Sequence, residues 1–287
     1  MRASDGALDL DAFARLVDFQ IDGGTAALVA AGSTGEAAAL DEAEFSTLVT
    51  AAAERTAGRV PLVAGTGQQS TRATIERTRR ARDAGAGFAL VVTPPYVRPT
   101  QEGLYAHFSE VAEHGGLPVV LYNVPTRTGC DLQPATASRL AGHGNIVGIK
   151  EAVPDPVRMR ALLAFRSDAF RVLSGDDPTC MRAQLDGADG VVSVAANVAP
   201  RTMAQLCRAC AAGDADRAMA LERALAPLFD ALAAEPNPIP LKWALSLLGF
   251  GEPCLRLPLL PLSPAHRDAI AVALRTRGLV EAAAAVG

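Results

Sequence analysis

Lysine is almost absent from this sequence of 287 residues. Its 27 basic residues include only two lysines, Lys150 and Lys242, and all the others are arginine. Histidine is also scarce, and its four residues lack the spacing of a metal site. The five cysteines are odd in number and scattered, which is not typical of a disulfide framework in a long chain. We therefore expect neither a metal site nor a disulfide scaffold.

Long apolar runs are missing as well. No segment reaches the ~18 consecutive apolar residues that a membrane span needs. The N-terminal MRASDGALDL has no apolar core of a signal peptide, so we expect a cytoplasmic protein. The formal net charge is -4, and the arginines are interspersed with carboxylates. Without a basic face, nucleic acid is excluded as the expected partner, and small neutral or anionic ligands are favoured.

What is present is a series of short, β-rich apolar runs, each flanked by helical patterns. Continuously apolar strands that alternate with helices predict a parallel sheet covered by helices. The first helix shows the expected period, with Leu10, Phe13 and Val17 on one face. The predicted strands lie within residues 26–32, 60–67, 88–95, 117–125, 145–152, 170–177 and 190–198.

This pattern fits an α/β barrel or an open doubly wound sheet, and the positions of the polar segments favour the barrel. Polar or glycine-rich segments follow nearly every strand, as in barrel enzymes, whereas an open sheet gathers its site at one switch point. After residue 200 helical segments continue to the end. We predict a (β/α)8 TIM barrel over residues 1–213 and a C-terminal helical extension over 214–287. Only seven strands can be counted, so the first barrel strand is apparently missing from this chain.

Lys150 is the first candidate for chemistry, because it ends the apolar run NIVGIKEA. A guanidinium stays protonated, whereas a desolvated amine can lose its proton and attack a carbonyl. A lysine kept there in an arginine-rich chain makes a Schiff-base amine a candidate equal to the alternative, a side chain that only extends to solvent.

Two further strand ends carry polar groups. The first predicted strand leads into Gly32-Ser33-Thr34-Gly35-Glu36, whose hydroxyls and amides can hold a carboxylate. A phosphate loop is disfavoured, because the lysine of the Walker pattern is absent. Tyr122 ends another strand and can move protons, and Arg127 on the same rim can pair with a substrate carboxylate.

Seven motifs together resemble the dihydrodipicolinate synthase family of pyruvate-dependent aldolases. The resemblance runs from residue 5 to residue 280, although GSTGE and GIK alone indicate only the wider superfamily. The motifs are GSTGE, AGTG, TPPYVRPTQEGLY, YNVPTRTG, GIKEA, SGDD and EPNPIPLKWA.

The resemblance implies a barrel lyase that assembles as a homodimer or homotetramer. It would condense pyruvate with L-aspartate 4-semialdehyde in the diaminopimelate route to lysine. Lys150 would form an imine with pyruvate, and no cofactor would be needed. Ser33, Tyr122 and Tyr96 match the proton relay of the family, with Tyr96 reaching in from the partner subunit.

The resemblance also implies the substrate contacts. Thr34 would hold the pyruvate carboxylate, and Arg127 the semialdehyde carboxylate. Val192 and Gly175 would line the pyruvate pocket. Arg127 favours the synthase over the sialic-acid lyase branch, which generally lacks an arginine there. The alternatives that stay open are an aldolase for a sugar-derived 2-keto acid and a non-catalytic paralogue that binds a keto acid.

Three departures from the family pattern matter. Ser33 replaces the usual threonine but keeps the hydroxyl. The positions of the lysine-feedback site have lost most of their polar groups, so we expect weak or no inhibition by lysine. They are Ala37, Ala38, Glu42, Phe45, Gln69, Ala73 and Pro95. Family members begin with about 11 further residues, including a strand, so we expect Met1 to be an internal methionine and a longer chain to be more soluble and active.

Overall fold

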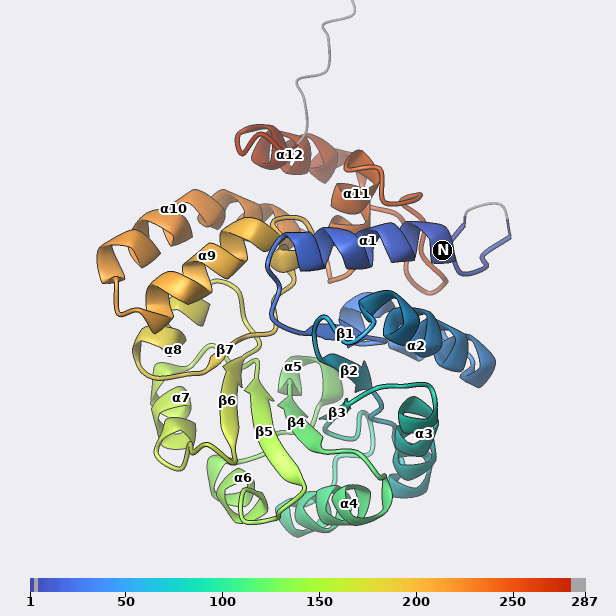
Figure 1. The fold of residues 1–287 in the computed structure, drawn as a ribbon, viewed down its shortest axis with the longest axis vertical. Coiled ribbons are helices and arrows are strands. Elements are labelled where there is room, and N and C mark those ends of the chain that lie inside the picture. Colours follow the sequence, from blue (N-terminus) through green and yellow to red (C-terminus); the bar gives the residue numbers. More distant parts are fainter. Residues whose placement is uncertain (3–4, 280–287) are drawn as a thin grey trace, which may run out of the picture.

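The computed structural model describes residues 1–2 and 5–279 and contains one curved parallel sheet (Figure 1). Within these residues the sheet has seven strands in the order β1-β2-β3-β4-β5-β6-β7. Each predicted apolar run contains one of them. The strands are β1 (Leu28–Ala30), β2 (Leu62–Gly65), β3 (Phe88–Val92), β4 (Val119–Asn123), β5 (Ile146–Glu151), β6 (Arg171–Ser174) and β7 (Gly190–Val191).

The strand order confirms the barrel-type prediction. Neighbours in the sheet are neighbours in the sequence, so no switch point of an open doubly wound sheet exists in the described part of the chain. Helices surround the outside of the curved sheet (Figure 1). They are α1 (Leu10–Asp22), α2 (Glu42–Thr56), α3 (Thr71–Asp83), α4 (Gln101–His114), α6 (Pro134–Leu140), α7 (Pro156–Leu163), α8 (Cys180–Leu185) and α9 (Pro200–Ala211). The short helix α5 (Pro125–Thr128) directly follows β4 and lies inside this ring in Figure 1.

Local sequence signals set the starts of several helices. Asp41 caps α2 by accepting the Glu44 amide at 2.8 Å, and Glu44 accepts the Asp41 amide in return. Ser70 and Thr100 cap α3 and α4 with their hydroxyl oxygens. Such caps satisfy backbone donors that the first helical turn leaves free. These caps therefore fix the residues at which α2, α3 and α4 begin.

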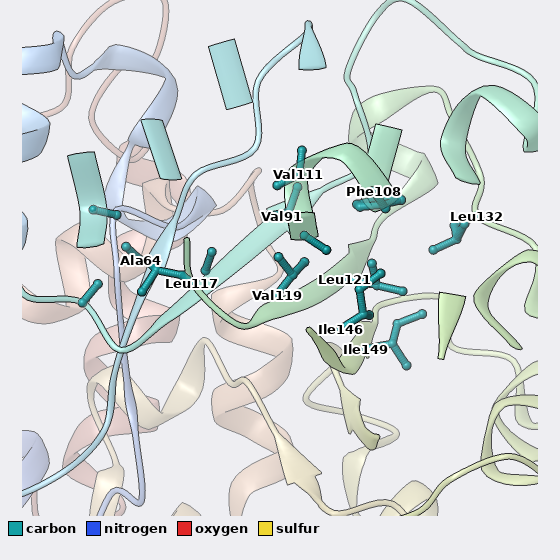
Figure 2. Close-up of a cluster of buried hydrophobic side chains, with 14 of the residues drawn as sticks. Ala64, Val91, Phe108, Val111, Leu117, Val119, Leu121, Leu132, Ile146 and Ile149 are labelled. Atoms are coloured by element: carbon teal, nitrogen blue, oxygen red, sulfur yellow. The ribbon is translucent and has the colours of Figure 1, made fainter. Parts of the chain in front are cut away.

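The two faces of the sheet carry different residues, because side chains alternate along a strand. On β4, Val119 and Leu121 point outward into the core shared with the helices, which Figure 2 shows together with Ile146 and Ile149 of β5. Val120 and Tyr122 point to the inner face and pack in a separate small cluster. The same alternation on β5 directs Lys150 inward and Glu151 outward.

The C-terminal helices form a second apolar core beside the sheet. Leu206 of α9 and Leu225 of α10 are both fully buried in it. The division at residue 213 stays a proposal, and residues 280–287 of the predicted extension lie outside the described residues. None of the helices in the described ranges has the length and apolar character of a membrane span. The remaining elements are α10 (Ala215–Leu232), α11 (Ile239–Leu247), α12 (Pro264–Arg275) and the 3-10 turns η1 (Ser33–Gly35), η2 (Ala37–Ala39) and η3 (Ala195–Asn197).

Candidate active site

Lys150 and Tyr122 lie side by side on the inner face of the sheet. They are directly paired in the register of β5 and β4. The Lys150 Nζ atom lies 4.1 Å from the centre of the Tyr122 ring. Parallel strands bring their carboxyl ends to the same rim, which is where barrel enzymes build their sites. The fold thus brings Lys150 of β5 into contact with Tyr122 of the neighbouring strand β4.

The amine of Lys150 is prepared to act as a nucleophile. Burial lowers its pKa to about 8, and the positive charge of Arg127 acts in the same direction, whereas Asp177 opposes them. A low dielectric environment disfavours the charged form of an amine. At neutral pH the uncharged fraction of Lys150 is therefore larger than that of an ordinary lysine, although the charged form still predominates.

Ser33 and Thr34 reach the same rim from the loop after β1. Burial raises the pKa of Tyr122, and the nearby Ser33 hydroxyl opposes this effect as a hydrogen-bonding group. The 3-10 turn η1 starts at Ser33 and is followed by Glu36 in the left-handed conformation, with φ 55°. The Ser33 and Tyr122 hydroxyls offer a path for a proton between the lysine and the surface, because both groups can donate and accept.

Arg127 and Thr34 are connected by a residue from a distant part of the chain. Arg127 Nη2 donates to the main-chain carbonyl of Asn237 at 3.0 Å. The Asn237 side-chain Nδ2 donates to Thr34 Oγ1 at 2.9 Å. The sequence placed Asn237 in the motif EPNPIPLKWA but indicated no role for its side chain. Asn237 thus contacts Arg127 through its main chain and Thr34 through its side chain.

Gly175 and Val192 lie beside the lysine. A Cβ atom on Gly175 would lie 2.8 Å from Lys150 Cε and 3.0 Å from Ala152 Cβ, so any larger residue would displace the amine. Val192 is partly buried, and its amide donates to the Ser174 carbonyl at 2.9 Å, which continues the pairing of β6 and β7. The absence of a side chain at Gly175 keeps open the space over Lys150.

Asp177 follows β6 in the SGDD motif, and its carboxylate is buried near Lys150. Its Oδ2 accepts the amides of Val194 and Ala195 at 3.0 and 2.8 Å. Burial nevertheless raises its pKa. A cavity of about 140 Å³ adjoins it, lined by Gly175, Asp176, Asp177, Pro178, Val194, Phe229, Leu232 and Asn237. No group of three His, Cys, Asp or Glu side chains in residues 1–2 and 5–279 could hold a metal ion.

Tyr96 is the one predicted site residue that does not join this cluster in the single chain. Its side chain is 90% exposed, and its backbone has a left-handed φ of 75°. Its amide donates to the Thr128 carbonyl at 3.0 Å, which fixes the loop after β3 against α5. The unusual backbone conformation thus directs the Tyr96 ring into solvent.

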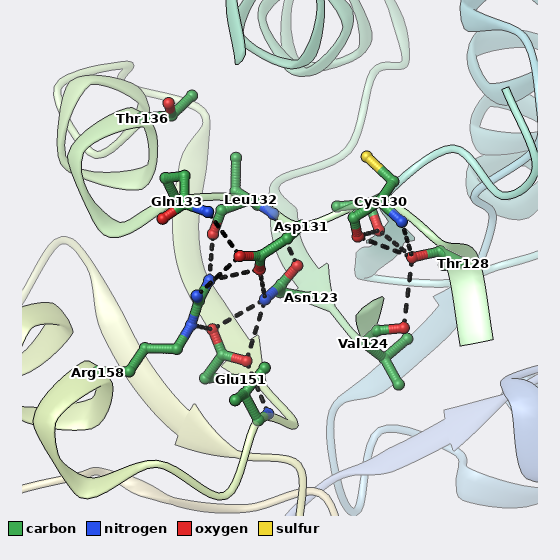
Figure 3. Close-up of polar contacts among 12 residues, drawn as sticks. Asn123, Val124, Thr128, Cys130, Asp131, Leu132, Gln133, Thr136, Glu151 and Arg158 are labelled. Carbon is green, nitrogen blue, oxygen red and sulfur yellow. Dashed lines mark hydrogen bonds and ion pairs between the residues drawn. The ribbon is translucent and has the colours of Figure 1, made fainter. Parts of the chain in front are cut away.

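A polar network backs the site on the outer face of the same two strands (Figure 3). Asn123 and Glu151 are paired in register one step beyond Tyr122 and Lys150. Asn123 Nδ2 donates to both Glu151 carboxylate oxygens at 3.1 Å and to Asp131 Oδ1 at 2.9 Å. Arg158 of α7 donates from Nε to Glu151 Oε2 at 2.7 Å and from Nη1 to Asp131 Oδ2 at 3.0 Å. The network binds the ends of β4 and β5 to the helix layer.

Comparisons with known proteins agree with this geometry. The Dihydrodipicolinate synthetase family matches residues 3–277. The chain is 57% identical over 265 residues to the 4-hydroxy-tetrahydrodipicolinate synthase of Xanthomonas axonopodis pv. citri, covering 92% of this chain and 87% of that one. It is 55% identical over 266 residues to the enzyme of the same name from Stenotrophomonas maltophilia, covering 93% and 89%.

A solved structure shares both the fold and much of the sequence. The chloride-inhibited dihydrodipicolinate synthase of Acinetobacter baumannii, complexed with pyruvate, superposes with a TM-score of 0.94 at 44% identity. The match covers 98% of this chain and 96% of that one. The family match spans nearly the whole chain, and the two enzymes named above share 57% and 55% of their aligned residues with it. This chain belongs to the dihydrodipicolinate synthetase family.

Proposed function

We propose that this chain is a 4-hydroxy-tetrahydrodipicolinate synthase, a lyase that condenses pyruvate with L-aspartate 4-semialdehyde on the diaminopimelate route to lysine. The observation that carries the proposal is the desolvated Lys150 amine, with a pKa of about 8, against the Tyr122 ring. Close relatives of the chain bear the same enzyme name.

The reaction begins at the Lys150 amine. Its lone pair attacks the ketone carbon of pyruvate, and loss of water gives an imine. The protonated imine withdraws electrons from the adjacent methyl group, so loss of a methyl proton yields an enamine. The enamine carbon then forms a bond to the aldehyde carbon of the semialdehyde, whose oxygen takes up a proton, and the imine with Lys150 is restored. The amino group of the semialdehyde then attacks the imine carbon and displaces Lys150, which closes the product ring and frees the amine. The chemistry needs no cofactor beyond this covalent imine.

Tyr122 and Ser33 move the protons of these steps. The Tyr122 ring lies against the Lys150 amine, and the Ser33 hydroxyl is close enough to Tyr122 to influence its pKa. Tyr96 completes the relay from the partner subunit of a homodimer or homotetramer. Its 90% exposed ring supports this assignment, because a large aromatic held away from its own chain is available to a second copy.

The substrate carboxylates bind on either side of Asn237. Thr34 and its neighbouring amides hold the pyruvate carboxylate, and Arg127 holds that of the semialdehyde by paired N–H donors. Gly175 and Val192 line the pyruvate pocket. We place the enzyme in the cytoplasm, where its small-molecule substrates are made, and we assign it no nucleic-acid or membrane partner.

A steady-state comparison of aldehyde acceptors tests the proposal. With pyruvate saturating, we expect turnover with L-aspartate 4-semialdehyde and at most weak turnover with the aldehydes from which aldolases make sugar-derived 2-keto acids. Preferred use of a sugar aldehyde would assign the chain to a sister aldolase. Imine formation without turnover of any aldehyde would favour a non-catalytic keto-acid-binding protein.

The rate of imine formation should rise with pH through about 8. Only the uncharged amine attacks the ketone, and burial lowers the pKa of Lys150 to about 8. Below this pKa the uncharged fraction grows tenfold per pH unit, and above it the rate should level off. Stopped-flow or quench measurements of borohydride-trapped adduct against pH provide the test. A rate that keeps rising through pH 10 would mean that the amine has its ordinary pKa.

Lysine should inhibit weakly or not at all. Two positions of the family feedback site, Glu42 and Phe45, are already engaged by the chain's own Arg77. The Arg77 guanidinium carbon lies 4.3 Å from the centre of the Phe45 ring, and Nε lies 3.9 Å from Glu42 Oε1. A second cation there would meet like charge. Initial rates should stay within about twofold up to millimolar L-lysine, and strong inhibition below that range would contradict the proposal.

A further inference from the structure

The second lysine of the chain contacts the loop that carries Ser33 and Thr34. Lys242 lies on α11 among the C-terminal helices, and its Nζ is 2.8 Å from Glu36 Oε1. The Glu36 side chain is 1% exposed and that of Lys242 is 20% exposed. The contact is electrostatic rather than a directed hydrogen bond, since Oε1 accepts none in the described residues. It is a largely buried ion pair.

Glu36 occupies a demanding position in this loop. It ends η1 and begins η2 with a left-handed backbone, which a residue other than glycine adopts only when its surroundings hold it there. Its second carboxylate oxygen, Oε2, accepts the Arg256 amide at 3.1 Å. Both oxygens are therefore held by the segment after residue 237, and the carboxylate anchors the loop to the C-terminal helices.

The charge of Glu36 creates a difficulty that Lys242 relieves. Pyruvate is an anion, and on the proposed function its carboxylate lies against Thr34, two residues before Glu36. An unpaired buried carboxylate so near would repel the substrate. The Lys242 ammonium, 2.8 Å from Glu36 Oε1, neutralises it, while Asn237 donates to Thr34 Oγ1 at 2.9 Å.

We propose that Lys242 is a positioning residue for the pyruvate half of the reaction: through Glu36 it fixes and neutralises the Ser33–Thr34 loop. The inference rests on the proposed function and extends it to a residue that touches no substrate. Arg127 lies on the other side of Asn237, so the semialdehyde half should not depend on Lys242 in the same way.

The test compares KM values for the two substrates. Lys242→Met should raise the KM for pyruvate by about tenfold or more, because loss of the charge partner shifts the loop. The KM for semialdehyde should change less than about threefold, whereas kcat should fall as well, because the same loop carries Ser33 of the proton relay. Lys242→Arg should restore most of the pyruvate KM because it keeps the charge. Equal rises in both KM values, or an unchanged pyruvate KM in a folded protein, would overturn the inference.

A second pair of variants covers the case in which Lys242→Met does not fold. In Glu36→Gln the buried charge is gone, so adding Lys242→Met should leave the pyruvate KM where Glu36→Gln alone put it. A further tenfold rise would show that Lys242 acts independently of Glu36 and would overturn the inference. Turnover of L-aspartate 4-semialdehyde by the wild type separates this outcome from failure of the proposed function, which would remove that turnover.

Discussion

Lys150→Arg is expected to abolish condensation, with kcat lowered by about three orders of magnitude or more. A guanidinium stays protonated and cannot form the imine, although it keeps the positive charge and much of the length. The substitution therefore separates nucleophilic chemistry from simple charge. Intact-mass spectra after incubation with pyruvate and borohydride should show one adduct on the wild type and none on this variant.

The chain supplies an unusually clean control for this experiment, because only one other lysine exists. Lys242→Arg leaves Lys150 as the sole lysine side chain, and at saturating pyruvate its adduct should persist. If the adduct instead persisted in Lys150→Arg and vanished in Lys242→Arg, the imine would belong to the wrong lysine and the mechanism would fail. If neither variant formed an adduct, both lysine amines would be needed for imine formation.

The sequence predicted the strands well because buried parallel strands are continuously apolar, and each of the seven runs contains one. The same property hides which face of a strand points inward, since both faces are apolar. The pairing of Lys150 with Tyr122 therefore could not be read from spacing. It depends on the register of β4 and β5, which shifts between Val119 and Val120.

Other parts of the site were beyond sequence reasoning for different reasons. Asn237 is 110 residues from Arg127 in the chain, and nothing local to either segment predicts their contact. Glu151 directly follows Lys150, but only the outward direction of its side chain shows that it belongs to the network in Figure 3. Tyr96 could be matched by family resemblance alone, since within one chain its ring contributes nothing to the cluster around Lys150.

Arg158→Met is expected to destabilise the protein by about 3–5 kcal/mol, because it leaves the buried Glu151 carboxylate without its cationic partner. The Glu151 side chain is fully buried, with 0% exposure, and that of Arg158 is 10% exposed. Burial already raises the pKa of Glu151, and Arg158 is the main group that opposes this effect. Without the guanidinium, Glu151 either stays charged in an apolar layer or takes up a proton and weakens its hydrogen bonds. Urea unfolding should show a lower midpoint with an unchanged slope.

Arg160→Met is the matched control, because Arg160 is an exposed arginine on the same helix, two residues further along. It should change stability by less than about 0.5 kcal/mol. Adding Glu151→Gln to Arg158→Met should recover part of the loss, since a neutral amide can still accept from Asn123 without leaving a buried charge. If Arg158→Met were no more harmful than Arg160→Met, the network would be a surface feature. If the double variant were worse than the single one by the full cost of a second lost partner, the two side chains would act independently. The expected coupling instead makes the outer-face ion pair the support that keeps Lys150 and Tyr122 in register on the inner face.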